Sequence, residues 1–409
     1  MNTTPASTTQ QLIAKGQRYF VPNYKPREMI LDHGQGSRLW DQEGKEHIDL
    51  GAGIAVNSLG HQHPALVRAL ETQTRKLWHT SNIYYTAPPI ELAEALVESC
   101  CAERVYFCNS GAEANEAAIK LVRKYASLHH PPQKREIISF QGSFHGRTLA
   151  AVTATAQPKY HEGFEPLPGG FRYCPFNDID ALREMISRER TCAVLVEPVQ
   201  GEGGIIPARP GFLQALRELC DAHDALLVTD EIQCGMGRTG HFWAHAWGGV
   251  EPDVITLAKA LGCGVPIGAM MTGKKVAETF QLGSHGSTFG GNPLACAVAL
   301  EAVRHLKDPE LLAHVARQGQ RLREQLAALG RDTGLFEEVR GVGLMLGAPL
   351  SPDWRGKAGE LMESARQHGV LILQAGPDVL RFLPPLVITD EELDTGLERL
   401  AQALRAAAS

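Results

Sequence analysis

A lysine and an aspartate that follow two apolar segments are the residues of this sequence best suited to chemistry. The segment at 226–229 ends on Asp230, and the segment at 254–257 is followed two residues later by Lys259. A lysine amine can hold an aldehyde cofactor as a Schiff base, and a carboxylate can keep a pyridine nitrogen protonated so that the ring withdraws electrons. The pair therefore indicates a pyridoxal 5'-phosphate site, although a helix cap and an exposed side chain would explain each residue taken alone.

The elements that must position these residues are short apolar strands that alternate with helical patterns between His61 and about Leu306. The expected strands are 105–108, 136–140, 193–197, 225–229 and 254–257. Such strands predict an α/β fold with a mostly parallel sheet covered on both faces. Functional side chains of such a sheet lie at the carboxyl ends of its strands.

The rest of the chain predicts a second, smaller domain. With 409 residues the chain is too long for one small core. After Asp308 the pattern changes to α+β and ends in a helix with a capping box at Thr389 and Glu392. The expected division is 1–60 for an N-terminal arm and part of the small domain, 61–306 for the large cofactor-binding domain, and 307–409 for the C-terminal small domain.

Composition excludes several classes of partner. Hydrophobic residues make up 44%, charged residues 21%, and the net charge is -6, so we expect neither nucleic acid nor a membrane surface as a partner. The nine cysteines include no C-x-x-C pair, which argues against structural zinc and disulfides and for a reducing cytoplasm. We expect small-molecule substrates.

Three further segments could complete a site. Ser110 and Gly111 begin a helix whose N-terminus suits a phosphate, although Ser110 and Glu113 also fit an ordinary capping box. Phe144 could stack on a flat ring and Arg147 could bind a carboxylate; core packing and a surface ion pair are the alternatives. A third segment carries Glu197, whose carboxylate could pair with an arginine in the site or could cap a helix or turn.

Two competing interpretations fit less well. The segment 235–240 matches G-x-G-x-x-G, but the residues after it do not form the helix that a dinucleotide site requires. The histidine pairs His61 with His63 and His241 with His245 have no obvious third ligand, so we expect no metal site.

Six segments in sequence order resemble the class III, or ornithine-type, pyridoxal-phosphate-dependent aminotransferases. They are NSGAEAN at 109–115, FHGRT at 144–148, EPVQGEG at 197–203, DEIQ at 230–233, AKALG at 258–262 and GSTFGGNP at 286–293. The resemblance runs from about Arg27 to Ala401 and is greatest to family members that act on N-acylated ornithine. It implies fold type I, with a large three-layer α/β/α domain, a small domain from both termini, and a homodimer with sites at the subunit interface.

The resemblance also implies roles for individual residues. Lys259 binds the cofactor covalently and Asp230 pairs with its pyridine nitrogen. The other implied cofactor-binding residues are Ser110, Gly111, Ala112, Phe144, Ile232, Gln233 and, from the neighbouring subunit, Thr288. The implied substrate-binding residues are Arg147, Glu197, Ser287 and Arg381, with Glu197 neutralising Arg381 while the acylated amine is bound.

The reaction implied by the resemblance is transfer of the δ-amino group of N2-acetyl-L-ornithine to 2-oxoglutarate. Succinylornithine, ornithine and 4-aminobutyrate are alternative donors within the family. Family members that use free ornithine carry a tyrosine near the position of Gly53 and Ile54, which favours an acylated donor here. Cys234 and Cys263 depart from the family pattern, which usually has threonine and glycine at these positions.

Overall fold

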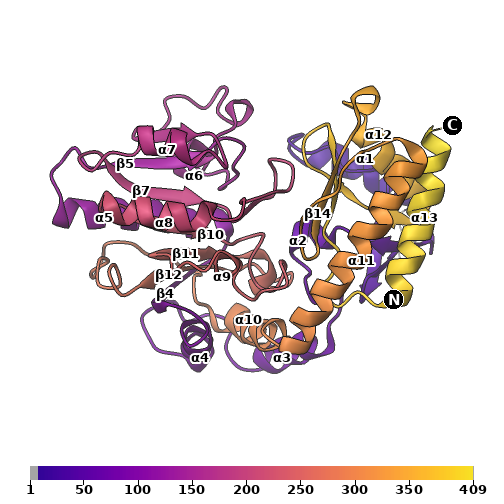
Figure 1. Cartoon of the computed structure of the whole chain (residues 1–409). Coiled ribbons are helices and arrows are strands. Elements are labelled where there is room, and N and C mark those ends of the chain that lie inside the picture. Colours follow the sequence, from indigo (N-terminus) through magenta and orange to yellow (C-terminus); the bar gives the residue numbers. More distant parts are fainter. Residues whose placement is uncertain (1–7, 409) are drawn as a thin grey trace.

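A seven-stranded sheet forms the centre of the larger body in the computed structural model, which describes residues 8–408 (Figure 1). In spatial order its strands are β4 (Ala102–Cys108), β12 (Gly268–Gly273), β11 (Val254–Leu257), β10 (Leu226–Asp230), β7 (Thr191–Val196), β5 (Glu136–Phe140) and β6 (Phe171–Cys174). Within this sheet only β12 runs antiparallel to its neighbours. The prediction of a mostly parallel sheet is confirmed, although the apolar pattern predicts neither β6 nor β12.

Alternate residues of the strands pack on opposite faces of this sheet. Leu226 and Val228 pack in one apolar cluster with α5 (Gly111–His129), whereas Leu227 packs in another with α8 (Phe212–Ala222). This follows from the period of two in a strand and gives the three layers of the predicted α/β/α fold. The other elements of this body are α3 (Pro64–Thr74), α4 (Ala87–Val97), α6 (Leu149–Ala154), η1 (Pro158–Tyr160), α7 (Ile179–Met185), β8 (Val199–Gln200), β9 (Ile206–Pro207), α9 (Ala244–Trp247), η2 (Lys259–Leu261) and α10 (Pro293–Leu306).

The smaller body contains a sheet built from both ends of the chain. In it β1 (Leu31–Gln35), β2 (Arg38–Asp41) and β3 (Glu46–Asp49) are joined by β15 (Val370–Leu371). A second sheet has the order β13 (Arg340–Val342), β14 (Met345–Pro349), β17 (Val379–Phe382), β16 (Leu373–Gln374). The helical elements here are α11 (Pro309–Thr333), η3 (Pro352–Trp354), α12 (Ala358–Gln367) and α13 (Asp390–Ala408).

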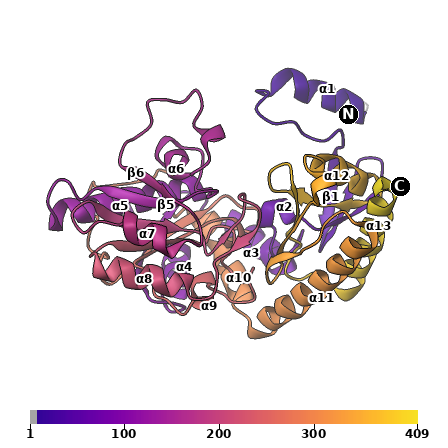
Figure 2. The same cartoon turned by 45° about the horizontal axis from the view of Figure 1, so that its top comes forward.

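The predicted capping box at the start of α13 is confirmed. The Glu392 backbone N–H donates to Thr389 Oγ1 (3.2 Å), and the Thr389 N–H donates to Glu392 Oε2 (3.0 Å). Near the other end of the chain, α1 (Thr9–Tyr19) buries none of its residues and projects from the smaller body (Figure 2), which it contacts where Thr9 Oγ1 donates to Gln42 Oε1 (3.1 Å). The helix α2 (Ala52–Ala55) is a short turn. No helix among residues 8–408 is both long and apolar enough to cross a membrane.

The glycine-rich segment 235–240 forms a turn around a buried arginine. Arg238 is 1% exposed, and its Nη1 donates to the backbone oxygens of Leu344 (3.1 Å) and Pro384 (2.5 Å). The next helix, α9, begins only at Ala244. Through the hydrogen bonds of Arg238 the segment therefore holds the larger body against the smaller one. It lacks the helix start of a dinucleotide site.

Candidate cofactor and substrate site

One cavity of about 430 Å³ lies where five strands of the large sheet end. The loops after β4, β5, β7, β10 and β11 contribute to its wall, as expected for a mostly parallel sheet. The predicted site residues that line it are Ser110, Gly111, Ala112, Phe144, Arg147, Glu197, Asp230, Ile232, Gln233 and Lys259. Three other predicted residues, Ser287, Thr288 and Arg381, do not line it.

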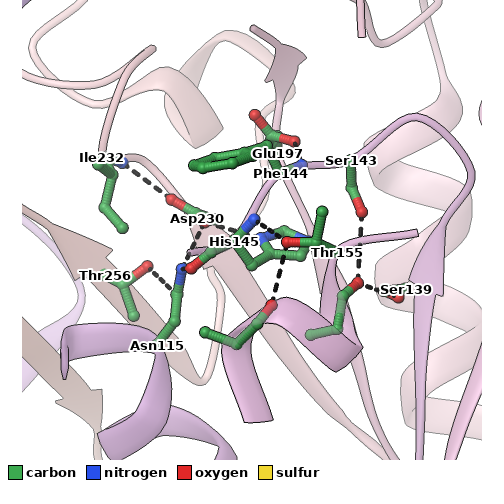
Figure 3. Close-up of polar contacts among 12 residues, drawn as sticks. Asn115, Ser139, Ser143, Phe144, His145, Thr155, Glu197, Asp230, Ile232 and Thr256 are labelled. Atoms are coloured by element: carbon green, nitrogen blue, oxygen red, sulfur yellow. Dashed lines mark hydrogen bonds and ion pairs between the residues drawn. The ribbon is translucent and has the colours of Figure 1, made fainter. Parts of the chain in front are cut away.

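The carboxylate of Asp230, at the end of β10, is buried and oriented by three contacts (Figure 3). Asn115 Nδ2 donates to Asp230 Oδ2 (2.7 Å), and His145 Nδ1 lies 2.8 Å from the same oxygen. The Ile232 backbone N–H donates to the other oxygen, Oδ1 (3.1 Å). A buried carboxylate held in this way can stabilise a positive charge in the cavity, such as a protonated ring nitrogen.

A polar chain behind Asp230 fixes the Asn115 amide. Thr256 Oγ1 donates to Asn115 Oδ1 (2.8 Å), and Asn115 Nδ2 also donates to the backbone oxygen of His145 (2.7 Å). Sequence reasoning missed all three residues. The sequence held a signal, because Asn115 is a polar residue within the alanine-rich segment GAEANEAA at 111–118, which begins α5.

Lys259 follows β11 and has an unusual backbone conformation. Its φ of 36° lies in the left-handed region, which non-glycine residues rarely adopt and which is often found at functional sites. The side chain is half-buried. Desolvation by the surrounding protein lowers the pKa of Lys259 to about 8. Glu202 acts in the opposite direction on this pKa. About a tenth of such an amine is neutral at pH 7.

The N-terminus of α5 offers backbone N–H groups beside the cavity. Ser110 Oγ accepts from the Glu113 N–H (3.2 Å), so the capping interaction is present and Ser110 also lines the cavity. At Gly111 a Cβ would lie 2.8 Å from Ile232 Cδ1, so a larger residue here would have to displace the Ile232 side chain. With 19 residues, α5 has a dipole that favours an anion such as a phosphate at this end.

Glu197 holds two loops of the cavity together. Its Oε1 accepts from the Phe144 N–H (2.9 Å) and its Oε2 accepts from the Gly201 N–H (3.2 Å). Burial raises the pKa of Glu197 to about 7. The residue thus orients the loop that carries Phe144.

Two buried polar atoms of cavity-lining residues have no hydrogen-bond partner within the described chain, Gln233 Oε1 and His145 Nε2. Together with Asp230, Lys259 and the start of α5 they give the cavity an anion for a ring nitrogen, an amine for an aldehyde and N–H groups for a phosphate. These residues fit pyridoxal 5'-phosphate.

Arg381 on β17 pairs with Glu202, which corrects the expected pairing with Glu197. Arg381 Nη1 lies 2.5 Å from Glu202 Oε1, and the arginine side chain is 4% exposed. Burial acts to raise the pKa of Glu202, but the charge and hydrogen bond of Arg381 outweigh it and lower that pKa. The expected pairing is wrong because Glu202 is the carboxylate that lies against Arg381, whereas Glu197 binds the N–H groups of Phe144 and Gly201.

The remaining predicted residues lie around the cavity. Arg147 is exposed, and its guanidinium carbon lies 3.9 Å from the centre of the Tyr160 ring. Ser287 Oγ accepts from Asn109 Nδ2 (3.2 Å), which places it next to the end of β4, and Thr288 is exposed. No group of three or more possible metal ligands occurs in the part of the chain that the structure describes.

Comparisons with known proteins match this chemistry. The family described as aminotransferase class-III matches residues 19–404. Acetylornithine aminotransferase of Xanthomonas campestris pv. campestris is 60% identical over 390 residues, covering 95% of this chain and 96% of that protein. The succinylornithine transaminase/acetylornithine aminotransferase of Pseudomonas aeruginosa is 51% identical over 387 residues, covering 95% of each chain.

Two solved aminotransferase structures are also similar to this chain. N-acetylornithine aminotransferase from Stenotrophomonas maltophilia K279a has a TM-score of 0.85 and 53% identity, covering 97% of this chain and 99% of that one. The ornithine aminotransferase from Toxoplasma gondii, described with partial occupancy of PLP at its active site, has a TM-score of 0.93 and 35% identity, covering 98% and 94%.

Proposed function

Because this chain belongs to the class III aminotransferase family, whose members use pyridoxal 5'-phosphate, we propose that it transfers the δ-amino group of N2-acetyl-L-ornithine to 2-oxoglutarate. The products are N-acetyl-L-glutamate 5-semialdehyde and L-glutamate, and the reaction belongs to arginine biosynthesis. The observation that carries the proposal is the Arg381–Glu202 pair, which lies close enough to Lys259 for both residues to affect its pKa. The identity to acetylornithine aminotransferases supports the choice of donor.

The chain's own residues bind the cofactor and move the proton. When bound, pyridoxal 5'-phosphate supplies a carbonyl for the amine and a ring that stabilises the carbanion left by proton loss. Asp230 keeps the positive charge on the ring nitrogen. Lys259 Nζ attaches the cofactor and transfers the substrate proton, and its pKa of about 8 lies near the pH at which a general base works efficiently.

The Arg381–Glu202 pair explains how one site accepts two unlike substrates. Near its reacting amine, acetylornithine has a methylene chain, whereas glutamate has an α-carboxylate. A buried arginine without a partner is costly, so Glu202 neutralises Arg381 while acetylornithine is bound. The carboxylate of glutamate or 2-oxoglutarate then replaces Glu202. Glu202 is the mobile partner, because its side chain is 24% exposed and that of Arg381 only 4%.

Arg147 binds the far end of the acylated donor in this proposal. It lines the cavity and is also exposed, and its guanidinium stacks on Tyr160. The rigid fork of an arginine suits the free α-carboxylate of acetylornithine. We assign Ser287 as a second substrate contact because it lies beside the loop that carries Ser110.

We also propose a homodimer in the cytoplasm. Large apolar side chains are exposed on the segment between α3 and α4, including Trp78 (62%), Tyr84 (75%) and Tyr85 (95%). A neighbouring groove of about 770 Å³ is lined by residues of α3, α4 and α10. Such a surface favours association with a second copy, whose cofactor phosphate the exposed Thr288 would then reach. All nine cysteines are free thiols, which supports a reducing compartment.

A donor panel tests the proposed function. The purified holoenzyme is assayed with 2-oxoglutarate and N2-acetylornithine, N2-succinylornithine, ornithine or 4-aminobutyrate. We expect kcat/KM to be highest for N2-acetylornithine. A preference for ornithine or 4-aminobutyrate would contradict the proposal, and a preference for succinylornithine would change only the acyl group.

A further inference from the structure

One aromatic ring beside the cavity contacts both the arginine and the phenylalanine that were predicted for the site. Tyr160 is the last residue of η1, and the Arg147 guanidinium carbon lies 3.9 Å from the centre of its ring. The Phe144 and Tyr160 rings meet edge to face, with 5.9 Å between their centroids and 83° between their planes. Phe144 and Arg147 line the cavity, whereas Tyr160 does not. Any effect of Tyr160 on a substrate is therefore exerted through these two residues.

Stacking is the contact that orients the Arg147 guanidinium. Within residues 8–408, Arg147 forms no ion pair and its N–H groups donate no hydrogen bond to the protein. Its guanidinium carbon lies 5.5 Å from the centre of the Phe144 ring and closer to that of Tyr160. Arg381, by contrast, is already paired with Glu202. The stacked Arg147 thus keeps its planar fork of N–H donors for a substrate carboxylate.

Hydrogen bonds on both sides of Tyr160 fix the position of its ring. Before it, Gln157 Nε2 donates to the backbone oxygen of Ser143 (2.9 Å), in the loop after β5. After it, the ring nitrogen Nε2 of His161 lies 2.7 Å from the backbone oxygen of Thr155. The Tyr160 backbone N–H also donates to the oxygen of Gln157 (3.0 Å). The ring is therefore a fixed surface against which a flexible side chain can pack.

A second cation lies near the same ring. Lys159 Nζ is 4.8 Å from the centre of the Tyr160 ring, and the lysine is exposed. A planar guanidinium stacks on an aromatic face, whereas an ammonium is a flexible point charge. Together with its shorter distance, this makes Arg147 the main partner of the ring. Lys159 adds positive charge beside the guanidinium, which favours the approach of a carboxylate.

We propose that Tyr160 is a positioning residue for the donor carboxylate, because its ring holds the Arg147 guanidinium with its N–H groups toward the cavity. This inference rests on the proposed function, in which Arg147 binds the α-carboxylate of N2-acetylornithine. Without the ring, the long arginine side chain samples many rotamers, and ordering it on binding costs entropy. The loss falls on donors that carry this carboxylate and leaves the proton transfer at Lys259 intact.

A donor without the carboxylate separates positioning from a general structural role. N-acetylputrescine is N2-acetylornithine with hydrogen in place of the α-carboxylate, and it keeps the reacting amine and the acetyl group. Single-turnover rates of the holoenzyme over a range of concentrations give a second-order rate constant for each donor. The ratio of the two constants, acetylornithine over N-acetylputrescine, measures what the carboxylate contributes.

The expected effect on this ratio is selective. Tyr160→Leu should lower it roughly 5- to 30-fold, the range for a partly desolvated contact between a cation and an aromatic ring. The fall should come from weaker saturation by acetylornithine, with its maximal rate nearly unchanged. Tyr160→Phe keeps the ring and should keep the wild-type ratio. Phe164→Leu is the matched control, because Phe164 is a 62% exposed aromatic residue of the same loop, whereas Arg147 stacks on Phe144 and Tyr160.

Binding of a non-reacting analogue gives a second readout. N-acetyl-L-norvaline has the α-carboxylate and the acetyl group but lacks the δ-amine, and its Kd for the holoenzyme is measured by calorimetry. Tyr160→Leu should raise this Kd by the factor by which it lowers the ratio. In a double-mutant cycle, Tyr160→Leu should cause no further change once Arg147→Ala is present, because the ring acts through the arginine.

The outcomes distinguish this inference from the proposed function. If the unmodified enzyme does not prefer acetylornithine to N-acetylputrescine, the assigned role of Arg147 fails, and this inference fails with it. If the preference exists and Tyr160→Leu slows both donors equally, or neither, the positioning role is overturned while the proposed function stands. If Tyr160→Leu does not fold, Tyr160→Gln decides in the same way, since it also lacks an aromatic face.

Discussion

Replacing Glu202 by alanine should change the preference of the enzyme between its two amine donors. The ion pair that is lost joins Glu202 Oε1 to Arg381 Nη1 at 2.5 Å, and the arginine side chain is 4% exposed. A charged hydrogen bond contributes about 1.5–3 kcal/mol, or about 10- to 150-fold in an equilibrium. Without Glu202, the guanidinium faces the methylene chain of acetylornithine unpaired, and that half-reaction should slow by this factor. Glutamate brings its own carboxylate, so its half-reaction should be unchanged or faster.

Single-turnover kinetics can separate the two half-reactions. The holoenzyme is mixed with acetylornithine or with glutamate, and the visible absorbance of the bound cofactor is followed. Glu197→Gln is the matched control, because Glu197 belongs to the same segment but contacts the N–H groups of Phe144 and Gly201. We expect this control to affect both half-reactions by similar factors. If Glu202→Ala also slows both equally, the reasoning about the arginine is refuted.

Four further outcomes are expected. Lys259→Ala should lower turnover by at least about 10²- to 10⁴-fold and lose covalent attachment of the cofactor; near wild-type activity would exclude Lys259 as the catalytic lysine. Asp230→Asn should still attach the cofactor but lose proton abstraction, which substrate deuterium exchange would measure; unchanged exchange would contradict its role. Asn115→Ala removes three hydrogen bonds and should lower the free energy of unfolding by about 2–5 kcal/mol in a denaturant titration, so an unchanged midpoint would contradict the network. Equimolar Lys259→Ala and Thr288→Ala subunits, dissociated and reassociated, should recover about a quarter of wild-type activity, because half of the dimers are hybrids with one intact site; a fully active monomer in sedimentation would end this idea.

The sheet and its two central residues could be predicted from local pattern. Asp230 ends an apolar strand and Lys259 follows another, and strands of one parallel sheet bring their carboxyl ends together. By contrast, β12 could not be recognised, because GAMMTG begins and ends with glycine and contains no β-branched run. Its antiparallel place between β4 and β11 depends on contacts between distant parts of the chain.

The sequence alone could not show which glutamate pairs with Arg381. Glu197 and Glu202 belong to one short segment, and Arg381 comes from β17 in the other body. Only the folded chain decides which of the two carboxylates lies against Arg381. The effect of Cys263 on the site also could not be predicted from the sequence. Its φ of 45° explains why glycine is usual at this position, but Cys263 does not line the cavity.

The most direct test of the proposed reaction follows the transferred nitrogen. The holoenzyme is incubated with 2-oxoglutarate and N2-acetylornithine labelled with ¹⁵N at the δ position, and the products are analysed by mass spectrometry. The account predicts that glutamate gains the ¹⁵N label in a one-to-one ratio with N-acetylglutamate 5-semialdehyde, and that Lys259→Ala abolishes this transfer. Unlabelled glutamate, or label that stays in acetylornithine while another donor is consumed, would contradict it.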